Sequence, residues 1–516
     1  MSRISSYRNK RVSSSRKEEM NEVTNFMDGI SFKCNPFDTL RMIAASSIFA
    51  EPSYYRTDDK DNKESTVSIF TKAIDDSLEF DYKKTIDYAV TLRTDYNMRL
   101  NPAVIFIRAV MHPKRKEFNQ SNAGYLRKIG NDIVLRPDDL TNQFDYWMLI
   151  NKTKNHLPSL IKRVWCDKLS HFNKYQLAKY QTKGLIDLVR ICHAKSENIN
   201  ELMKNGRMNV SDEDMTWERL RSVKNTWKDI FNKIDMPHMA LLRNIRGIFT
   251  EVEDLDFAKQ VMNKLKEGIE YGKQFPYRYY VTRDMIQKDE NSDIHHKGIL
   301  MDALEECMDM SMINFPKLKG STICLSDNSG SAWGVLTSEY GSTRIAEIDN
   351  LSSIMTAYNS DEGYVGIFGD NLKIIPIQKR VGILKQCSEC RKIGQNIGGS
   401  TENGIWLFFK DAIDNKIHYD NIFIYSDMQA GHGGLYGANP KEYQEFIKDS
   451  SYIDVYKLLL KYRQTVNKNV NVFSVQTAGY DNSVLPENTY RTSILTGWTG
   501  KEVLFAQEMI NIWNQQ

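Results

Sequence analysis

The sequence predicts a two-part fold, in which an all-α region of helical repeats is followed by an α/β domain. Before Pro316 the apolar residues recur at helical spacing and glycine is sparse, whereas after Lys319 short apolar runs alternate with longer amphipathic segments. At 516 residues the chain is long enough for two or three domains, each with its own core. We therefore divide it into residues 1–20, 21–315 and 316–516.

The first segment, residues 1–20, is predicted to be a basic disordered tail. Met1 to Lys17 carries six basic residues and no acid, interleaved with serines, as expected of a solvated tail. It lacks the apolar core of a secretory signal, and nowhere does the chain offer the roughly 18 consecutive apolar residues that span a bilayer. Seven cysteines without a disulfide-like pattern fit a reducing compartment. We therefore expect a cytoplasmic protein with no membrane segment.

The second segment, residues 21–315, is predicted to be a solenoid-like stack of helix pairs. Short polar breaks such as Met111–Pro113 and Lys183–Gly184 separate the helices. A helical region of this length exceeds what one core supports, and the sequence shows no coiled-coil heptads. A stack in which each pair contacts its neighbours is therefore the expected architecture.

The third segment, residues 316–516, is predicted to form an α/β domain. Its short apolar runs predict strands, and two amphipathic stretches, Pro440–Arg463 and Lys501–Trp513, predict helices. The predicted strands are Thr322–Leu325, Tyr364–Phe368, Asn421–Tyr425 and Val470–Val475. Ligands of such domains lie beyond the carboxyl ends of the strands.

Oxygen-bearing side chains follow two of these strands and one glycine loop. Asp327, Ser329 and Ser331 alternate directly after a strand, Thr401 follows a Gly-Gly-Ser run, and Asp427 ends another strand. Carboxylate and hydroxyl oxygens around one point are the ligands that a hard cation such as Mg²⁺ prefers. The five residues are therefore predicted to bind Mg²⁺ or another divalent cation.

A catalytic role for Ser329 is not expected. The loop lacks the preceding glycine of a Gly-x-Ser-x-Gly nucleophile elbow, and two carboxylates among hydroxyls do not resemble a two-metal phosphodiesterase centre. No phosphate-binding or dinucleotide-binding glycine fingerprint is present either. The sequence predicts a binding protein, not an enzyme.

A cationic cluster lies between Ile161 and Lys195. The net charge of the whole chain is only +3, so any nucleic-acid site must be local. Cations that neutralise phosphate stand here beside the rings of Phe172, Tyr175 and Tyr180, a combination used in sequence-tolerant RNA binding. The predicted RNA-binding residues are Lys162, Arg163, Lys168, His171, Lys174, Lys179, Lys183, Arg190, His193 and Lys195.

Basic runs at Lys114–Lys116 and Arg127–Lys128 are predicted to form a secondary RNA surface. The first of these runs has no aromatic residue interleaved with it. Its charge is therefore the main reason for including it.

Four helical motifs resemble the TROVE module of the Ro ribonucleoprotein autoantigen family. They are Asn101–Ala103, Tyr175–Tyr180, Leu188–Lys195 and Met236–Ile245. The five cation-site residues in turn resemble the metal-ion-dependent adhesion site of von Willebrand factor A domains. The family joins a ring of HEAT-like helical repeats to such a Rossmann-like A domain, so both halves of the chain point to it.

Membership in this family would imply RNA binding. Its members hold small noncoding Y RNAs on the outside of the ring and the ends of misfolded RNAs in its hole, which implies a role in RNA quality control. In the family a histidine in a longer turn contributes to Y RNA binding, whereas this chain has only Lys183–Asp187 there. The chain therefore departs from the family at a position that contributes to Y RNA contact.

A second interpretation is a metal-dependent protein-recruitment adaptor with a helical scaffold. In it, the bound cation accepts a carboxylate from an acidic protein partner such as a nuclease. A monomer is expected under both interpretations.

Overall fold

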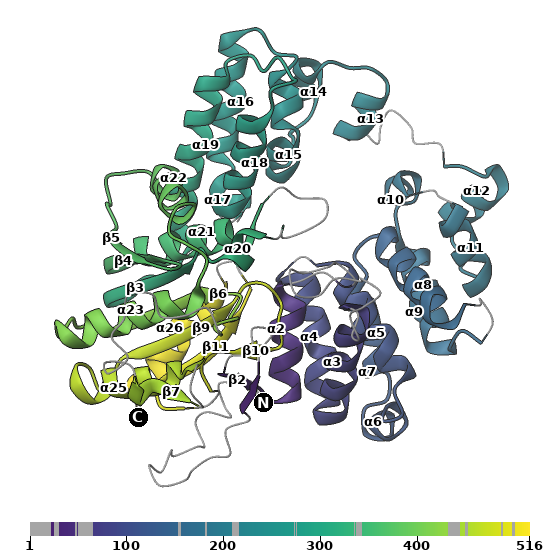
Figure 1. Cartoon of the computed structure of the whole chain (residues 1–516). Coiled ribbons are helices and arrows are strands. Elements are labelled where there is room, and N and C mark those ends of the chain that lie inside the picture. Colours follow the sequence, from purple (N-terminus) through teal and green to yellow (C-terminus); the bar gives the residue numbers. More distant parts are fainter. Residues whose placement is uncertain are drawn as a thin grey trace. The chain divides into compact units, whose positions relative to one another are not determined.

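The computed structural model describes two compact units of the chain (Figure 1). One unit contains helices α2 to α12, and the other contains strands β1 and β2 and all elements from α13 onward. The predicted tail, residues 1–20, lies outside the described residues. These are 22–24, 30–46, 49, 66–96, 98–152, 156–180, 183–208, 216–272, 274, 276–334, 336, 343–431, 444–448, 452–486, 489–497 and 501–515.

The first unit is built from helices that bury one apolar face each. Asn101 ties the start of α5 to earlier parts of the unit, because its side chain accepts a hydrogen bond from the Phe49 amide and donates one to the Ala44 carbonyl, both at 2.9 Å. Trp165 and Phe106 are fully buried in the shared core. The helices are α2 Pro36–Ser46, α3 Thr66–Phe80, α4 Tyr82–Thr94, α5 Leu100–Met111, α6 Arg115–Ser121, α7 Tyr125–Ile133, α8 Pro137–Asn151, α9 Ser159–His171, α10 Lys174–Lys179, α11 Lys183–Cys192 and α12 Glu197–Asn205.

The second unit begins with a further group of helices. Their core is continuous with one face of the sheet that follows, since buried residues of α15 to α19 and of the sheet form a single apolar cluster. The helices are α13 Trp217–Ser222, α14 Trp227–Lys233, α15 His238–Phe249, α16 Leu255–Glu267, α17 Ile269–Gly272, α18 Pro276–Lys288, α19 Lys297–Ser311 and the 3₁₀ turn η1 Met312–Asn314.

A six-stranded sheet in the order β11-β9-β6-β3-β4-β5 forms the centre of the second unit. Every pairing is parallel except that of β5 with β4. The four predicted strands are confirmed as β3, β4, β6 and β9, whereas β5 and β11 were not predicted. The strands are β3 Leu318–Asp327, β4 Ser360–Phe368, β5 Leu372–Pro376, β6 Asn421–Ser426, β9 Asn471–Gln476 and β11 Thr492–Thr496.

Helices cover both faces of this sheet. Side chains alternate along each strand, so that Ile422 and Ile424 pack with α23 and α25 on one face, while Phe423 and Tyr425 pack with α21, α22 and α26 on the other. Both faces are buried, which explains the nearly continuous apolar runs of the strands. The helices are α20 Gly330–Gly334, α21 Ile345–Tyr358, α22 Ile383–Gly394, α23 Thr401–Asp414, α25 Val455–Thr465 and α26 Lys501–Asn514, with the turn η2 Gln444–Phe446.

Two details of the sequence prediction are wrong. The segment 21–315 is not purely helical, because β1 Glu22–Thr24 and β2 Ile30–Lys33 form a small sheet with β10 Asn482–Ser483. Within the described part of the helix predicted over Pro440–Arg463, the strands β7 Ile447–Lys448 and β8 Tyr452–Ile453 precede α25, which starts at Val455; residues 440–443 lie outside the described residues. The predicted closing helix is confirmed as α26. Among the residues described, no helix is long and apolar enough to cross a membrane.

Candidate metal centre and nucleic-acid surface

Two strands that end in acids lie side by side where the order of the sheet reverses. After β3 the chain adds β4 and β5 on one side, and it then crosses over to add β6, β9 and β11 on the other. The carboxyl ends of β3 and β6 therefore flank the switch point at which α/β proteins bind ligands. Asp327 is the last residue of β3, and Asp427 directly follows β6.

The loop after β3 brings three predicted ligands together. The Asp327 carboxylate accepts a hydrogen bond from the Ser329 amide at 2.8 Å, which fixes the turn that leaves the strand. The hydroxyl oxygens of Ser329 and Ser331 lie 3.2 Å apart. All three residues are buried.

The glycine loop before α23 places Thr401 next to this turn. Gly398 has a φ of 97°, and a Cβ there would lie 2.3 Å from a neighbouring carboxylate, so only glycine fits. The Gly399 carbonyl accepts a hydrogen bond from the Gly330 amide at 3.1 Å and joins the two loops. As a result, the Thr401 hydroxyl lies 3.5 Å from the Asp327 carboxylate.

A tight turn after β6 holds Asp427. Met428 has a positive φ of 63°, and its amide donates a hydrogen bond to the Ser426 hydroxyl at 2.9 Å. The Asp427 carboxylate accepts hydrogen bonds from the Gln429 amide at 3.1 Å and from the Ser331 hydroxyl. Thus the fifth predicted ligand contacts the first loop directly.

Burial and mutual repulsion raise the pKa values of these carboxyl groups. Burial and the nearby charge of Asp327 raise the pKa of Asp427 to about 7. Burial and the charge of Glu402 raise the pKa of Asp327, and burial raises the pKa of Asp349 on α21 well above its ordinary value. Ionisation of these carboxyl groups is therefore unfavourable in the protein alone, and a bound cation would favour their charged forms.

The donor set fits a hard divalent cation. Adjacent oxygens of an octahedral Mg²⁺ shell lie about 3 Å apart, close to the 3.2 Å between the serine hydroxyls and the 3.5 Å between Thr401 and Asp327. In the described part of the chain, no group of three or more His, Cys, Asp or Glu side chains is placed to hold a metal. A cation here would therefore depend on the hydroxyls as well as on the two carboxylates.

Two further polar residues of the site were missed in the sequence. The Ser426 hydroxyl donates a hydrogen bond to the Asp327 carboxylate, and the buried Glu402 carboxylate accepts one from the Ser400 hydroxyl at 2.6 Å. Both stand directly beside a predicted ligand in the chain. That adjacency was the available signal, but it does not reveal which way a side chain points.

The predicted RNA-binding residues lie on three helices of the first unit and just beyond them. Successive residues of a helix rotate by about 100°, so Lys162, Arg163 and Lys168 point in directions roughly 100° or more apart around α9. One face of α9 therefore does not carry all its cations. Lys162, Arg163, Lys168 and His171 are on α9, Lys174 and Lys179 on α10, Lys183 and Arg190 on α11, and His193 and Lys195 follow α11; the side chain of Lys183 lies outside the described residues.

Several of these cations already have partners within the protein. Lys174 pairs with Glu201 at 3.0 Å, and burial lowers the pKa of Lys168. Arg163 and Lys195 are exposed. These two side chains are accordingly better placed to meet an external phosphate than Lys174 or Lys168.

Arg190 and the two predicted histidines lie on the surface. Arg190 is 3.8 Å from Asp187 one turn earlier in α11. The ring Nδ1 of His171 lies 2.5 Å from the Asp167 carbonyl oxygen at the end of α9. His193 is exposed in the turn after α11, with a φ of 56°. All three remain accessible, although Arg190 and His171 have local contacts.

The aromatic rings of the cluster are less available than expected. Phe172 is buried in the core of the unit and cannot stack on a base. The Tyr180 ring lies 4.9 Å from the Arg136 guanidinium and 5.8 Å from the Lys179 ammonium. The surface therefore offers charge more readily than open stacking rings.

The comparisons with known proteins point to one family. The TROVE domain family model matches residues 203–300, which run from the end of α12 into α19. The crystal structure of the Ro (RSR) protein of Deinococcus radiodurans is similar, with a TM-score of 0.57, 12% identity, and coverage of 94% of this chain and 100% of that chain. A search of curated proteins by sequence gives no match. The family resemblance read from the sequence is confirmed.

Proposed function

We propose that this chain is a member of the Ro family and that it binds RNA as a component of a ribonucleoprotein. The observation that carries the proposal is the TROVE match over residues 203–300, within a chain that shares its fold with a Ro protein over nearly its whole length. The proposed activity is binding, without turnover of the RNA.

The charges of the first unit support this proposal. Arg163, Lys179 and Lys195 are exposed, and exposed cations supply the phosphate contacts that give nucleic-acid affinity. Because the rings of this region are buried or already flanked by cations, we infer that phosphate contacts contribute more here than base stacking.

We propose small noncoding RNA of the Y-like class and the single-stranded ends of misfolded RNA as the ligands, and RNA quality control as the role. The short connection Lys183–Asp187 lies within α11 and lacks the family's histidine. Y-like RNA would therefore rely on charge contacts rather than on that residue.

We further propose that residues 316–516 act as a von Willebrand factor A-like domain with Mg²⁺ or another divalent cation. Asp327, Ser329, Ser331, Thr401 and Asp427 would hold the ion, which would neutralise the buried carboxylates and supply a positive charge at the sheet edge. These residues orient one another through the hydrogen bonds described above.

Crosslinking in cells followed by sequencing of the recovered RNA tests the proposal. We expect small structured RNAs and RNAs with single-stranded ends to be enriched over a mock purification. Recovery of a protein partner in a Mg²⁺-dependent manner, with no RNA above the mock, would favour the recruitment adaptor instead.

A further inference from the structure

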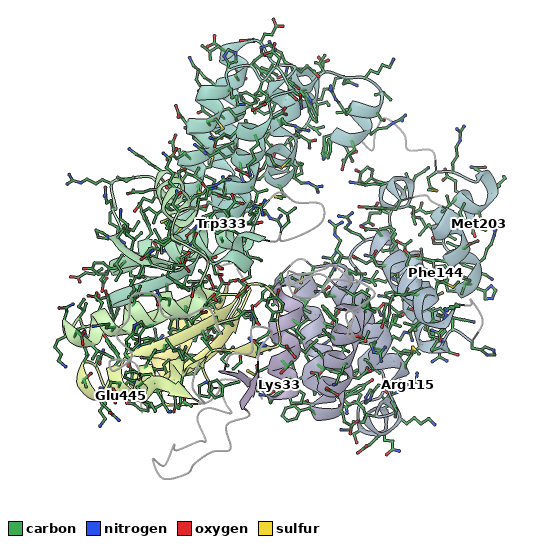
Figure 2. All side chains as sticks on the ribbon, viewed as in Figure 1. Lys33, Arg115, Phe144, Met203, Trp333 and Glu445 are labelled. Atoms are coloured by element: carbon green, nitrogen blue, oxygen red, sulfur yellow. The ribbon has the colours of Figure 1, made fainter. Side chains whose placement is uncertain are left out.

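A groove of about 710 Å³ lies on the first unit, between helices α6, α7 and α9. Its size is within the range of ligand sites. Arg115, labelled in Figure 2, lies at the start of α6 and lines one side. The lining residues are Arg115, Lys116, Asn119, Ala123, Gly124, Leu126, Arg127, Pro158, Ser159, Leu160 and Arg163.

The lining is strongly cationic. Arg115, Lys116, Arg127 and Arg163 contribute four positive charges, and none of the lining residues described is acidic or aromatic. Among the described residues, only Arg127 of these four has an ion pair, with Asp167 at 2.6 Å. Three cations thus face the groove with their charge uncompensated by an ion pair.

Arg127 is held in place at the edge of this groove. Its guanidinium donates two hydrogen bonds to Asp167, at 2.7 and 2.6 Å, and this pairing raises the pKa of Arg127. A guanidinium that is fixed by a carboxylate still presents its remaining N–H donors. It can therefore position a phosphate while the other three cations supply net charge.

The backbone around the groove adds positive potential. Gly124 precedes α7 and Pro158 precedes α9, and neither helix has a side-chain cap at this end. The first-turn amides of helices carry partial positive charge. Gly124 has a φ of 80°, and a Cβ there would meet nothing within 4 Å, so the backbone is open to a ligand at this point.

We propose that this groove binds successive phosphates of an RNA backbone without reading its bases; the inference rests on the proposed RNA-binding function and adds a site to it. Charge without carboxylates favours a polyanion, and the lack of lining aromatics leaves no surface on which a base would stack. The groove therefore accepts a duplex, whose bases are already stacked, as well as a single strand.

Titration of the full chain with a blunt RNA duplex over a range of salt concentrations tests the site. The variant Arg115→Glu/Lys116→Glu/Arg163→Glu is compared with Lys72→Glu/Lys204→Glu/Arg207→Glu, which reverses three exposed cations of the same unit outside the groove. Thermal unfolding followed by circular dichroism checks that each variant folds, and the corresponding Gln triple in the groove removes charge without reversing it.

The groove variant should bind the duplex at least about tenfold more weakly. The slope of log binding constant against log salt concentration should also become shallower by about 2 to 3, since each phosphate contact contributes about 0.7–0.9 to that slope. The Gln triple should show an intermediate loss and the control little change. An equal loss of affinity in the control, or unchanged binding in the groove variant, would show that the groove is not the RNA site. The proposed RNA-binding function would not be affected by either result.

Two other outcomes separate the alternatives. If the wild-type chain binds no RNA at low salt, the proposed function fails and the groove assignment fails with it. If polyglutamate binds the wild type as tightly as RNA does and the groove variant loses it, the groove is a site for an acidic protein, and the RNA assignment is wrong.

Discussion

The Thr401 hydroxyl lies 3.5 Å from the Asp327 carboxylate, although 74 positions separate the two residues in the chain. The contact arises because the Gly399 carbonyl is hydrogen-bonded to the Gly330 amide, which closes two loops on each other at the carboxyl end of the sheet. If a cation bound between the loops, the Thr401 hydroxyl and the Asp327 carboxylate would both be available to hold it, in place of their long contact with each other.

Mg²⁺ should stabilise the protein. Because the buried carboxylates repel one another without a cation, Mg²⁺ at about 100 times its Kd should add about 2.7 kcal/mol to the free energy of unfolding. Calorimetric titration and unfolding with and without Mg²⁺ measure this, and Asp327→Asn and Thr401→Ala should each weaken the effect.

Ser388→Ala is the matched control for the hydroxyl variant, because it removes a hydroxyl from α22, where Ser388 donates a hydrogen bond to the Leu384 carbonyl of the same helix. It should leave the Mg²⁺ response unchanged. A Mg²⁺ response that survives in Asp327→Asn would show that the ion binds elsewhere.

Gly394→Ala should weaken Mg²⁺ binding without altering a ligand. A Cβ at Gly394 would lie 1.9 Å from the Asn328 side-chain oxygen, and Asn328 cannot move easily because it exchanges two hydrogen bonds with Asn350, both at 3.0 Å. We expect a loss of about 1–3 kcal/mol in unfolding free energy, together with weaker Mg²⁺ affinity from the displaced Asp327 loop.

Gly298→Ala provides the comparison for this substitution. Gly298 is in α19, with nothing within 4 Å of an added Cβ, so alanine should be neutral or stabilising by up to about 1 kcal/mol. Equal effects of the two substitutions would contradict the crowding at Asn328.

His238 should make the second unit less stable in acid. Its Nε2 lies 2.7 Å from the Tyr279 hydroxyl, and burial lowers its pKa. The unfolded chain then binds the proton more readily, so this stability is present above the unfolded pKa of about 6.5 and is lost as the pH falls towards the lower folded value. Denaturant unfolding between pH 7 and 5 measures it.

His238→Gln should flatten that pH dependence, whereas His418→Gln, at an exposed position, should preserve it. An unchanged pH profile in His238→Gln would rule out His238 as the titrating group. Gly268 and Gly272 confine the ring, since a Cβ at either would lie within 2.5 Å of it.

The sequence predicted the centre of the sheet better than its edges. Strands β3 and β6 are buried on both faces and therefore appear as continuous apolar runs. Strand β5, which is half-exposed and ends in Pro376, and the short β11 lack that signal. Strand β2 pairs not only with β1 but also with β10, a segment some 450 positions away, as the Ser31 to Ser483 hydrogen bond shows, and local periodicity does not reveal such a partner.

The cation site could likewise be predicted from the sequence better than the RNA-binding surface. The five predicted cation ligands are brought together because strand order and loop closure place them at one edge. Among the cationic residues, spacing alone did not show that Lys174 pairs with Glu201 or that Phe172 is in the core. Charge pairing and burial depend on neighbouring helices, which the sequence of one helix does not specify.

Reversal of the predicted RNA-binding lysines should weaken RNA binding. Lys174→Glu/Lys179→Glu/Lys183→Glu removes up to three phosphate contacts, and Lys174→Glu also places two carboxylates together at Glu201. We expect at least about a tenfold loss at low salt and a smaller salt slope. Unchanged binding in a gel shift would show that the RNA lies elsewhere on the chain.

The most direct test of the account is a salt-dependent gel shift of the full chain with RNA that carries a single-stranded end. We predict a retained complex at low salt. The logarithm of the binding constant should fall linearly with the logarithm of the salt concentration, because phosphate contacts dominate the affinity. Failure to retain that RNA at low salt would contradict the assignment of this chain as an RNA-binding protein.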